Sequence, residues 1–341
     1  MSKSAIIIGG GTAGMETASQ LSRLGIKVNL IETQPHPGGH LNSWDRLFPN
    51  RRDSKEVYEY LERGMNDAIS LHLNAEIDLI RHESERFTVE LKDGKELNSD
   101  ALVLATGYEV FDAGKKEEYG YGIYDNVITS VELEEIFRNN KQKNLFGGMA
   151  SKRIGIIHCV GSRDEKAGNL YCSKLCCVTG VKQAIEIKEL MPDAEVFCFY
   201  MDLRMSDRYF EEMYYEAQEK WGIQFIRGRL SEASENQDKT LLIKVEDTLT
   251  GLPMKMKAGL LILLVGIVPS PETRRLVAML GLKEGDDRFL CPADEHTFTN
   301  TTTIPGVFIA GTVKGPAGIA STIADARATA LQVAAYLNSL K

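Results

Sequence analysis

Short apolar runs alternate with segments of helical period along this chain, and that order predicts an α/β fold with parallel sheets. Two strands are expected at the start, Ala5 to Ile8 and Lys27 to Ile31, with an amphipathic helix between them. A hairpin turn is expected at Asp93-Gly94 and a helix after Cys177. Further strands are expected at Ala101 to Ala105, Lys152 to Val160, Glu195 to Tyr200, Leu241 to Val245, Met256 to Val265 and Val307 to Ala310.

The first strand ends in a glycine-rich turn, Gly9-Gly10-Gly11-Thr12-Ala13-Gly14, which is a G-x-G-x-x-G motif between a strand and a helix. Gly9 permits the tight turn, Gly11 lets the backbone approach a pyrophosphate, and Gly14 lets the helix pack on the strand. Glu32 ends the second strand, where a carboxylate can bind ribose hydroxyls. The motif predicts a dinucleotide site at these residues; the alternative is a glycine-rich turn of another α/β fold.

Four of the six cysteines lie close together in the sequence, at Cys159, Cys172, Cys176 and Cys177. Cys159 follows an apolar strand, and Cys172 and Cys176 share a face if they lie on one helix. Four thiolates from a strand end and a helix start can hold one metal centre. Adjacent cysteines are unusual for zinc, whose ligands are commonly separated by two to four residues. The spacing therefore favours an iron–sulfur cluster over zinc and over free or redox-active thiols.

Composition limits the class of protein. The chain has 341 residues, of which 43% are hydrophobic and 26% charged, as in a globular protein of about two domains. A net charge of −8 argues against a nucleic-acid partner. The longest apolar run, near Leu260 to Val268, is too short for a membrane span, and the first is too short for a signal peptide. A cytoplasmic protein is expected, in which clustered thiols stay reduced.

Three further segments resemble the flavin-binding pattern of flavoproteins with two dinucleotide-binding domains. Thr312 stands where those proteins usually have an aspartate, and a plain βα unit is the alternative for this tail. His40 has a second interpretation as a solvated loop residue. The resemblance implies FAD contacts at Gly38, Gly39, His40, Ala105, Thr106, Gly107, Gly311, Thr312, Ala317, Gly318 and Ile319.

The assembled chain resembles the A-type subunit of heterodisulfide reductase in a minimal form. The most specific match is C-V-G-S-R-D followed by Y-C-S-K-L-C-C, which begin at Cys159 and Tyr171. The resemblance implies FAD in the first domain and a [4Fe–4S] cluster on Cys159, Cys172, Cys176 and Cys177. The cluster would lie where related pyridine-nucleotide disulfide oxidoreductases bind NAD(P)H. It also implies B- and C-type partner subunits and a homodimer.

Short members of this kind resemble the corresponding component of heterodisulfide-reductase-like complexes in sulfur oxidisers. The chain has no ferredoxin-type cysteine run, so the wiring for flavin-based electron bifurcation is missing. Two Rossmann-like domains of the thioredoxin-reductase type are expected, the second inserted in the first. Residues 1–110 and 265–341 would bind FAD, and residues 111–264 would carry the cluster.

The predicted function is electron relay between FAD, the cluster and partner subunits. Lys182 is a candidate catalytic residue that stabilises anionic reduced flavin, or else a solvated surface lysine. One rival function is an NAD(P)H-dependent FAD disulfide oxidoreductase, which needs a second glycine motif or a C-x-x-C, and neither is found. The other rival is a non-enzymatic scaffold stabilised by zinc or flavin.

Overall fold

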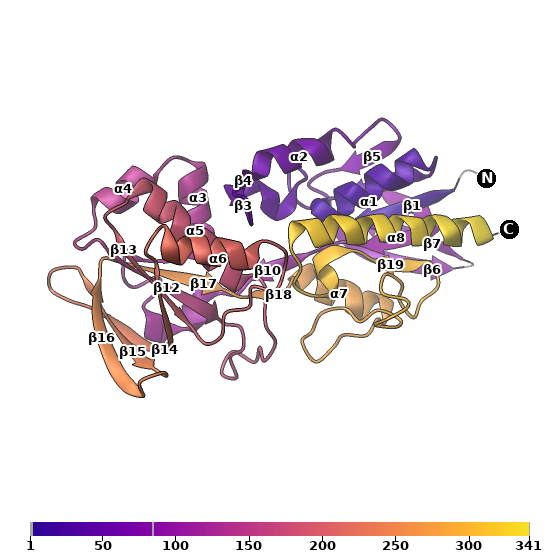
Figure 1. Ribbon diagram of the computed structural model, residues 1–341. Coiled ribbons are helices and arrows are strands. Elements are labelled where there is room, and N and C mark those ends of the chain that lie inside the picture. The colour runs from indigo at the N-terminus through magenta and orange to yellow at the C-terminus, as the bar shows by residue number, and fades with distance from the viewer. Residues whose placement is uncertain (1–2, 84, 341) are drawn as a thin grey trace. The chain divides into compact units, whose positions relative to one another are not determined.

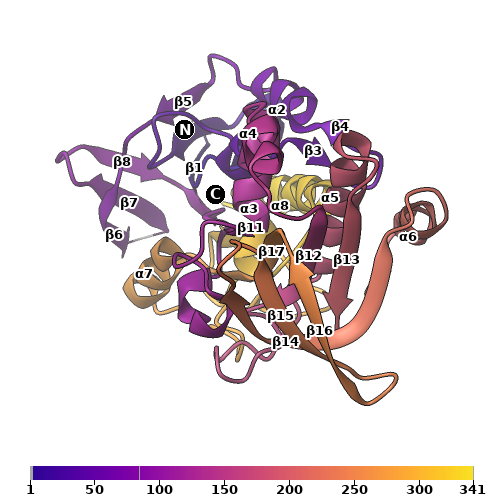
Figure 2. The same ribbon diagram turned by 90° about the vertical axis from the view of Figure 1, so that its left-hand side faces the viewer.

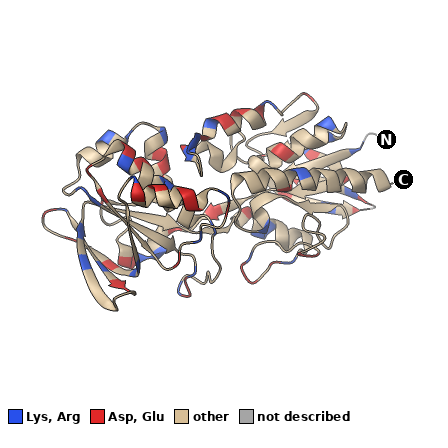
Figure 3. Ribbon diagram, in the orientation of Figure 1, with Lys and Arg blue, Asp and Glu red and all other residues tan. Residues whose placement is uncertain are grey.

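The computed structural model describes residues 3–83 and 85–340, and the chain forms two compact units (Figure 1). Unit 1 contains residues up to 42, residues 55–109 and residues from 268 onward. Unit 2 contains residues 43–54 and 110–267. Residues 43–54 are expected in the first domain from the sequence, but they pack in unit 2. Acidic and basic side chains are interspersed over both units (Figure 3).

A five-stranded parallel sheet with the order β19-β9-β1-β2-β5 forms the centre of unit 1. Its strands are β1 (Ser4–Ile8), β2 (Lys27–Ile31), β5 (Ile69–His72), β9 (Ala101–Leu104) and β19 (Val307–Ile309). Central parallel strands are buried on both faces, which explains their continuous apolar sequence. The expected strands at these positions are confirmed.

Side chains of β1 alternate between two cores. Ala5 and Ile7 pack with helices α1 (Thr12–Arg23) and α8 (Ile319–Ser339), which run side by side (Figure 1). Ile6 and Ile8 face the other side, among apolar residues of a three-stranded antiparallel sheet and of α7 (Pro271–Leu280). That sheet consists of β6 (Ile77–Glu83), β7 (Arg86–Leu91) and β8 (Glu96–Ser99), with the expected hairpin turn at Asp93-Gly94.

Unit 2 is built on a seven-stranded sheet with the order β11-β17-β12-β13-β14-β15-β16. The first five strands of this order run parallel, and β14, β15 and β16 form an antiparallel extension. The strands are β11 (Val127–Thr129), β12 (Arg153–Val160), β13 (Glu195–Tyr200), β14 (Gln224–Glu235), β15 (Leu241–Asp247), β16 (Leu252–Ala258) and β17 (Leu260–Val265).

The single strand expected from Met256 to Val265 is wrong, because two strands share that segment. The chain turns at Gly259, where an added Cβ would overlap the carbonyl oxygen of Ser151. β16 then lies at the edge of the sheet and β17 in its interior. Six buried residues of β17 in succession mimic the continuation of one strand.

Helices α3 (Ser130–Arg138), α5 (Cys176–Leu190) and α6 (Phe210–Glu219) share one apolar core with the sheet of unit 2 (Figure 2). Thr129 caps α3 and forms a capping box with Glu132. The expected helix after Cys177 is confirmed. The remaining elements are η1 (Gly39–Asn42), α2 (Ser54–Glu62), η2 (Ala113–Lys115), η3 (Glu117–Tyr119), α4 (Gln142–Gly147), η4 (Gly311–Lys314) and the paired strands β10 (Tyr108–Val110) and β18 (Ile267–Pro269).

Residues 43–54 form a short hairpin of β3 (Arg46–Leu47) and β4 (Arg52–Asp53), hereafter called the strap. Phe48 packs edge-on against Phe210 of α6, with ring centroids 5.5 Å apart. Ser54 at the end of the strap is fully buried and donates to the carbonyl of Trp44. The strap is therefore held by both apolar and polar contacts of unit 2.

Among residues 3–83 and 85–340, no helix combines the length and the apolar character needed to cross a membrane.

Candidate functional site

The glycine motif of unit 1 forms the turn that its sequence predicts. Gly9 has a φ of +105°, and a Cβ there would overlap the carbonyl oxygen of Ala105. A Cβ on Gly14 would overlap the carbonyl oxygen of Gly9, so this glycine brings α1 against the turn. A Cβ on Gly11 would have Gly39 Cα, 3.9 Å away, as its nearest neighbour. The backbone at Gly11, and with it Thr12 and Ala13 at the start of α1, thus meets the requirement of a pyrophosphate site.

The Gly38-Gly39 turn lies directly beside the glycine motif. The Gly38 amide donates to the carbonyl of Gly10 at 2.8 Å, and a Cβ on Gly39 would lie 3.1 Å from Gly11 Cα. Both glycines have positive φ, which L side chains rarely adopt. The structure therefore brings these two predicted segments together.

The other two predicted segments reach the same end of the sheet. Ala105 donates to the carbonyl of Ile8 at 2.8 Å. A Cβ on Gly107 would lie 3.7 Å from Thr312 Oγ1, and a Cβ on Gly311 would lie 2.6 Å from the Cβ of Ala13. Thr106 Oγ1 is engaged with Thr273 Oγ1 at 2.6 Å. Four segments far apart in sequence thus surround the N-terminus of α1.

The start of α8 follows the predicted Ala317-Gly318-Ile319 segment. Gly318 is the N-cap in extended conformation and has no side chain that could bond the first amides of the helix. Helix N-termini attract anions and electron-rich groups through these amides. The amides are therefore available to a ligand, as the flavin resemblance requires.

Glu32 is buried and bonded to the backbone of unit 1. One carboxylate oxygen accepts the Gly10 amide at 2.7 Å, and the other accepts the Gln34 amide at 2.8 Å. These bonds place the carboxylate at the first glycines of the motif. Its binding of ribose hydroxyls stays a prediction.

His40 is half-buried, so its interpretation as a solvated loop residue is wrong. Its ring stacks on Tyr108 at 4.2 Å between centroids, and Nε2 lies 3.0 Å from the Tyr108 carbonyl oxygen. Burial lowers the pKa of His40, against a smaller opposing effect of that carbonyl. The sequence interval of 68 residues between these partners explains why the stacking could not be anticipated.

The four clustered cysteines lie in unit 2 at the carboxyl end of β12 and the start of α5. Cys159 lies at the end of β12 with a φ of +61°, and Cys176 and Cys177 open α5. Cys172 precedes the helix, so the expectation that it shares a helical face with Cys176 is wrong. All four are free thiols.

The loop between Cys159 and Cys172 is fixed by polar contacts. The Ser162 hydroxyl donates to the Tyr171 carbonyl and accepts the Ser173 amide, each at 3.0 Å. Asp164 is buried and pairs with the equally buried ammonium of Lys116 at 2.8 Å. A second ion pair joins Asp164 to Arg229 at 2.9 Å. Neither Lys116 nor Asp164 carries a motif, and their partnership was not predicted.

Electrostatics relate the cysteines to one another. Burial raises the pKa of Cys159 to about 12, and Cys177 and Cys172 add to that effect, while Arg163 and Arg204 oppose it. Burial likewise raises the pKa of Cys176, with contributions from the other three cysteines. The thiols thus lie near one another in a place that needs added positive charge to ionise them.

The cysteine set suits a cluster better than a single ion. Across the described residues, no three His, Cys, Asp or Glu side chains are grouped closely enough to hold one metal ion. A cubane separates its four thiolates more widely than one ion does. The Lys174 amide donates to Cys172 Sγ at 3.3 Å, a contact that supports a metal-bound thiolate. The donor set therefore fits a [4Fe–4S] cluster.

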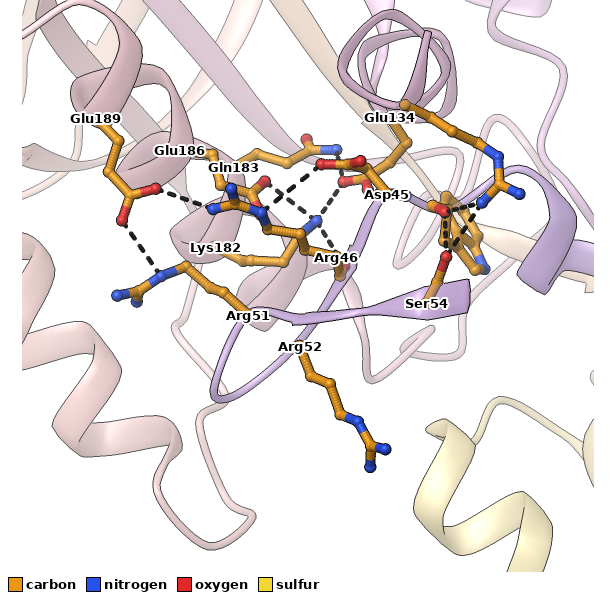
Figure 4. Close-up of polar contacts among 12 residues, drawn as sticks. Asp45, Arg46, Arg51, Arg52, Ser54, Glu134, Lys182, Gln183, Glu186 and Glu189 are labelled. Carbon is orange, nitrogen blue, oxygen red and sulfur yellow. Dashed lines mark hydrogen bonds and ion pairs between the residues drawn. The ribbon is translucent and has the colours of Figure 1, made fainter. Parts of the chain in front are cut away.

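Lys182 is almost fully buried on α5, so its interpretation as a solvated surface lysine is wrong (Figure 4). Its ammonium contacts Glu134 at 2.5 Å, Glu186 at 3.1 Å and the carbonyl oxygen of Arg46 at 2.9 Å. An ammonium has three donors, and all three are engaged in unit 2. Contact with a flavin stays a prediction that requires one of these bonds to break.

Comparison with known proteins places the chain in a family. Residues 1–129 match the model of the pyridine nucleotide-disulphide oxidoreductases. The A-type subunit of the H(2):CoB-CoM heterodisulfide,ferredoxin reductase of Methanothermobacter thermautotrophicus is 31% identical over 97% of this chain and 63% of its own. An A-type iron-sulfur subunit of the CoB–CoM heterodisulfide reductase of Methanopyrus kandleri is 43% identical over 69% of this chain and 36% of its own.

The solved structure of T. acidophilum thioredoxin reductase matches all of both chains with a TM-score of 0.67 at 18% identity, which concerns the fold alone. The chain spans less than two thirds of the length of the curated relatives named above. The expected α/β fold with two dinucleotide-type domains is confirmed. The chain belongs to the family of A-type heterodisulfide reductase subunits, on the fold of the pyridine nucleotide-disulphide oxidoreductases.

Proposed function

We propose that this protein is the FAD- and [4Fe–4S]-containing electron-transfer subunit of a heterodisulfide-reductase-like complex. The observation that carries the proposal is the gathering of four thiols where β12 passes into α5. In unit 1 the corresponding strand-to-helix turn is a glycine motif. Unit 2 thus offers a ligand set for a one-electron centre where a second nucleotide turn would otherwise be expected.

The residues of unit 1 bind and orient the flavin in this proposal. The amides around Gly11 and the start of α1 take the pyrophosphate, and Glu32 takes the ribose. The uncapped start of α8 faces the electron-rich edge of the ring system. When bound, FAD supplies the exchange between two-electron and one-electron transfer.

The residues of unit 2 hold the cluster and isolate it. Cys159, Cys172, Cys176 and Cys177 are the ligands, and the bonded loop around Ser162 and Asp164 keeps the first two in place. Arg163 and Arg204 supply positive charge beside the thiolates. These features support a relay whose reduced state is held without a large rearrangement.

The names of the relatives support partner subunits of the B and C type, because the A-type subunit is one component of those reductases. We further infer a homodimer in the cytoplasm. Sulfur oxidation is the proposed pathway, by analogy with short members of this kind.

Metal and flavin analysis of the anaerobically purified protein tests the proposal. We expect one FAD and about four irons per chain. Cys176→Ser should lose the iron and keep the FAD, whereas Cys291→Ser, a partly exposed cysteine of unit 1, should keep both. Zinc in place of iron would contradict the proposal and favour the scaffold alternative.

The second candidate is an NAD(P)H-dependent disulfide oxidoreductase, which the thioredoxin reductase fold favours. Mixing the purified protein with NADH under argon distinguishes the two. Rapid bleaching of the flavin in the absence of partner proteins would support the disulfide oxidoreductase. Our proposal predicts slow or absent bleaching.

A further inference from the structure

A buried charged cluster in unit 2 grips the backbone of the strap. It consists of Lys182 and Glu186 on α5 and Glu134 on α3, each at most about one-twentieth exposed (Figure 4). The Lys182 ammonium donates to the carbonyl of Arg46 at 2.9 Å. Glu134 accepts the backbone amide of Asp45 at 3.1 Å. One donor and one acceptor of the cluster thus hold adjacent residues of the strap.

Glu134 is held in turn by neutral neighbours. Gln183 donates to its carboxylate at 2.7 Å and to the Ser130 carbonyl at 2.8 Å. The three acceptor contacts of Glu134 come from Lys182, Gln183 and the strap. The carboxylate therefore has a fixed orientation before the strap is added.

Further contacts hold the two ends of the strap to the same elements. Arg51 forms a bidentate pair with Glu216 of α6 at 3.0 and 3.1 Å and reaches Glu189 of α5 at 3.5 Å. The Arg46 side chain pairs with the other Glu189 oxygen at 3.1 Å (Figure 4). The strap consequently has anchors to α3, α5 and α6.

Stability alone is a poor explanation for this cluster. Burying an ammonium and two carboxylates is costly, and a well-packed apolar core often serves stability equally well. Buried polar groups with defined partners instead fix one arrangement of the chain. Here the group that is fixed is the backbone of residues 45 and 46.

The strap continues directly from the flavin-binding turn. η1 (Gly39–Asn42) ends one residue before the strap begins, and Asn42 Nδ2 donates back to the Pro37 carbonyl at 2.9 Å. Arg46 follows His40 by only six positions. A chain this short cannot absorb a displacement of its clamped end without moving its other end.

We propose that Lys182 and Glu134 clamp the strap and thereby position the Gly38–His40 turn for FAD. Lys182 is then a positioning residue. The inference rests on the proposed FAD site of unit 1 and does not require the iron–sulfur cluster. It makes occupancy of unit 1 depend on a contact made wholly within unit 2.

Hydrogen exchange and FAD affinity of Lys182→Met test the clamp. In FAD-free protein, the amides of Asp45 and Ser54 should exchange at least about tenfold faster, while β12 and β13 keep their protection. The dissociation constant for FAD should rise about tenfold, with an altered visible flavin spectrum. Lys244→Met, which removes a surface pair with Glu232, should change none of these.

A triple variant, Glu134→Gln/Lys182→Met/Glu186→Gln, covers the case in which the single variant fails to fold. It leaves no uncompensated buried charge and should show the same faster exchange and weaker FAD binding. Protection at Asp45 and Ser54 as in the wild type would overturn the clamp. A released strap with unchanged FAD affinity and spectrum would overturn its positioning role. Absence of FAD from the wild type would instead refute the proposed function, while the exchange data would still decide whether the clamp holds the strap.

Discussion

The carboxyl ends of β1 and β12 occupy the same topological position in the two units, yet they carry different chemistry. Each strand lies inside a parallel sheet and passes into a helix, α1 or α5. After β1 the turn is glycine-rich, and neighbouring backbone fills the side-chain space at Gly9 and Gly14. At the end of β12 stands a cysteine, followed by a long bonded loop that returns three more cysteines.

The difference concerns what the backbone is free to do. At Gly11 the space beside the backbone is open, as a phosphate requires. In the cysteine loop the amides are already used: Arg163 donates to Tyr171, and Ser173 donates to Ser162. The same fold position therefore offers amides in one unit and thiols in the other, and the loop sequence decides which cofactor fits.

The greatest loss should come from closing the glycine turn of unit 1. In Gly14→Ala the new Cβ would overlap the Gly9 carbonyl oxygen, so α1 and the turn must separate. We expect FAD binding to be lost and unit 1 to be destabilised by about 3 kcal/mol or more. FAD titration and urea unfolding measure both effects.

The control for this substitution is Gly147→Ala in α4, where a Cβ meets nothing within 4 Å. It should leave FAD binding unchanged. Undiminished FAD affinity in Gly14→Ala would mean that the turn does not bind the dinucleotide, and the comparison with β12 would fail.

A smaller effect is expected from releasing the cysteine loop. Asp164→Ala removes the partner of the buried Lys116 ammonium and should destabilise unit 2 by about 3 kcal/mol at pH 7. Iron retention should fall while FAD binding persists. Denaturant unfolding and iron content are the measurements, and Asp193→Ala, which loses a surface pair with Lys152, is the matched control.

The loss in Asp164→Ala should depend on pH in a defined direction. Burial raises the pKa of Asp164, but the stronger combined effect of Lys116 and Arg229 leaves that pKa below its ordinary value. Its contribution to stability is therefore present above the ordinary value of 3.8 and is lost as the pH falls through the lower folded value. A difference between variant and wild type that stays constant under acid conditions would contradict the buried pair.

The weakest effect is expected at Glu186. Burial raises the pKa of Glu186 to about 7, with Lys182 and Arg46 opposing the shift and Glu134 reinforcing it. The folded protein then holds a proton that the unfolded chain releases near pH 4.5, so wild-type stability falls as the pH rises from that value towards 7. Glu186→Gln should weaken this decline, which urea unfolding at pH 5 and pH 8 measures. An identical decline in both proteins would place the titrating group elsewhere.

Sequence patterns were sufficient where a residue acts through its own backbone. The glycine motif, the hairpin at Asp93-Gly94 and the β13 strand follow local rules of turn and strand formation, and the structure has them where expected. The four cysteines also stand around a strand end and a helix start, because those positions depend on neighbours in sequence.

The sequence was insufficient where the partner is distant. Lys182 is 48 positions from Glu134 and 136 from Arg46, so no local pattern shows that it is buried. The strap contains only a short apolar stretch, and its packing depends on Phe210 and on α5. A lysine at a helical position facing the core side was the one available signal, and its charge concealed it.

Two different redox groups at equivalent strand ends should both respond to a single reductant. Stepwise dithionite reduction of the anaerobically purified protein, followed by visible and EPR spectroscopy, observes the two groups in one sample. We expect flavin bleaching together with a cluster EPR signal of comparable intensity per chain, the latter absent in Cys176→Ser. Flavin bleaching without any cluster signal in iron-supplied wild-type protein would show that unit 2 holds no redox centre.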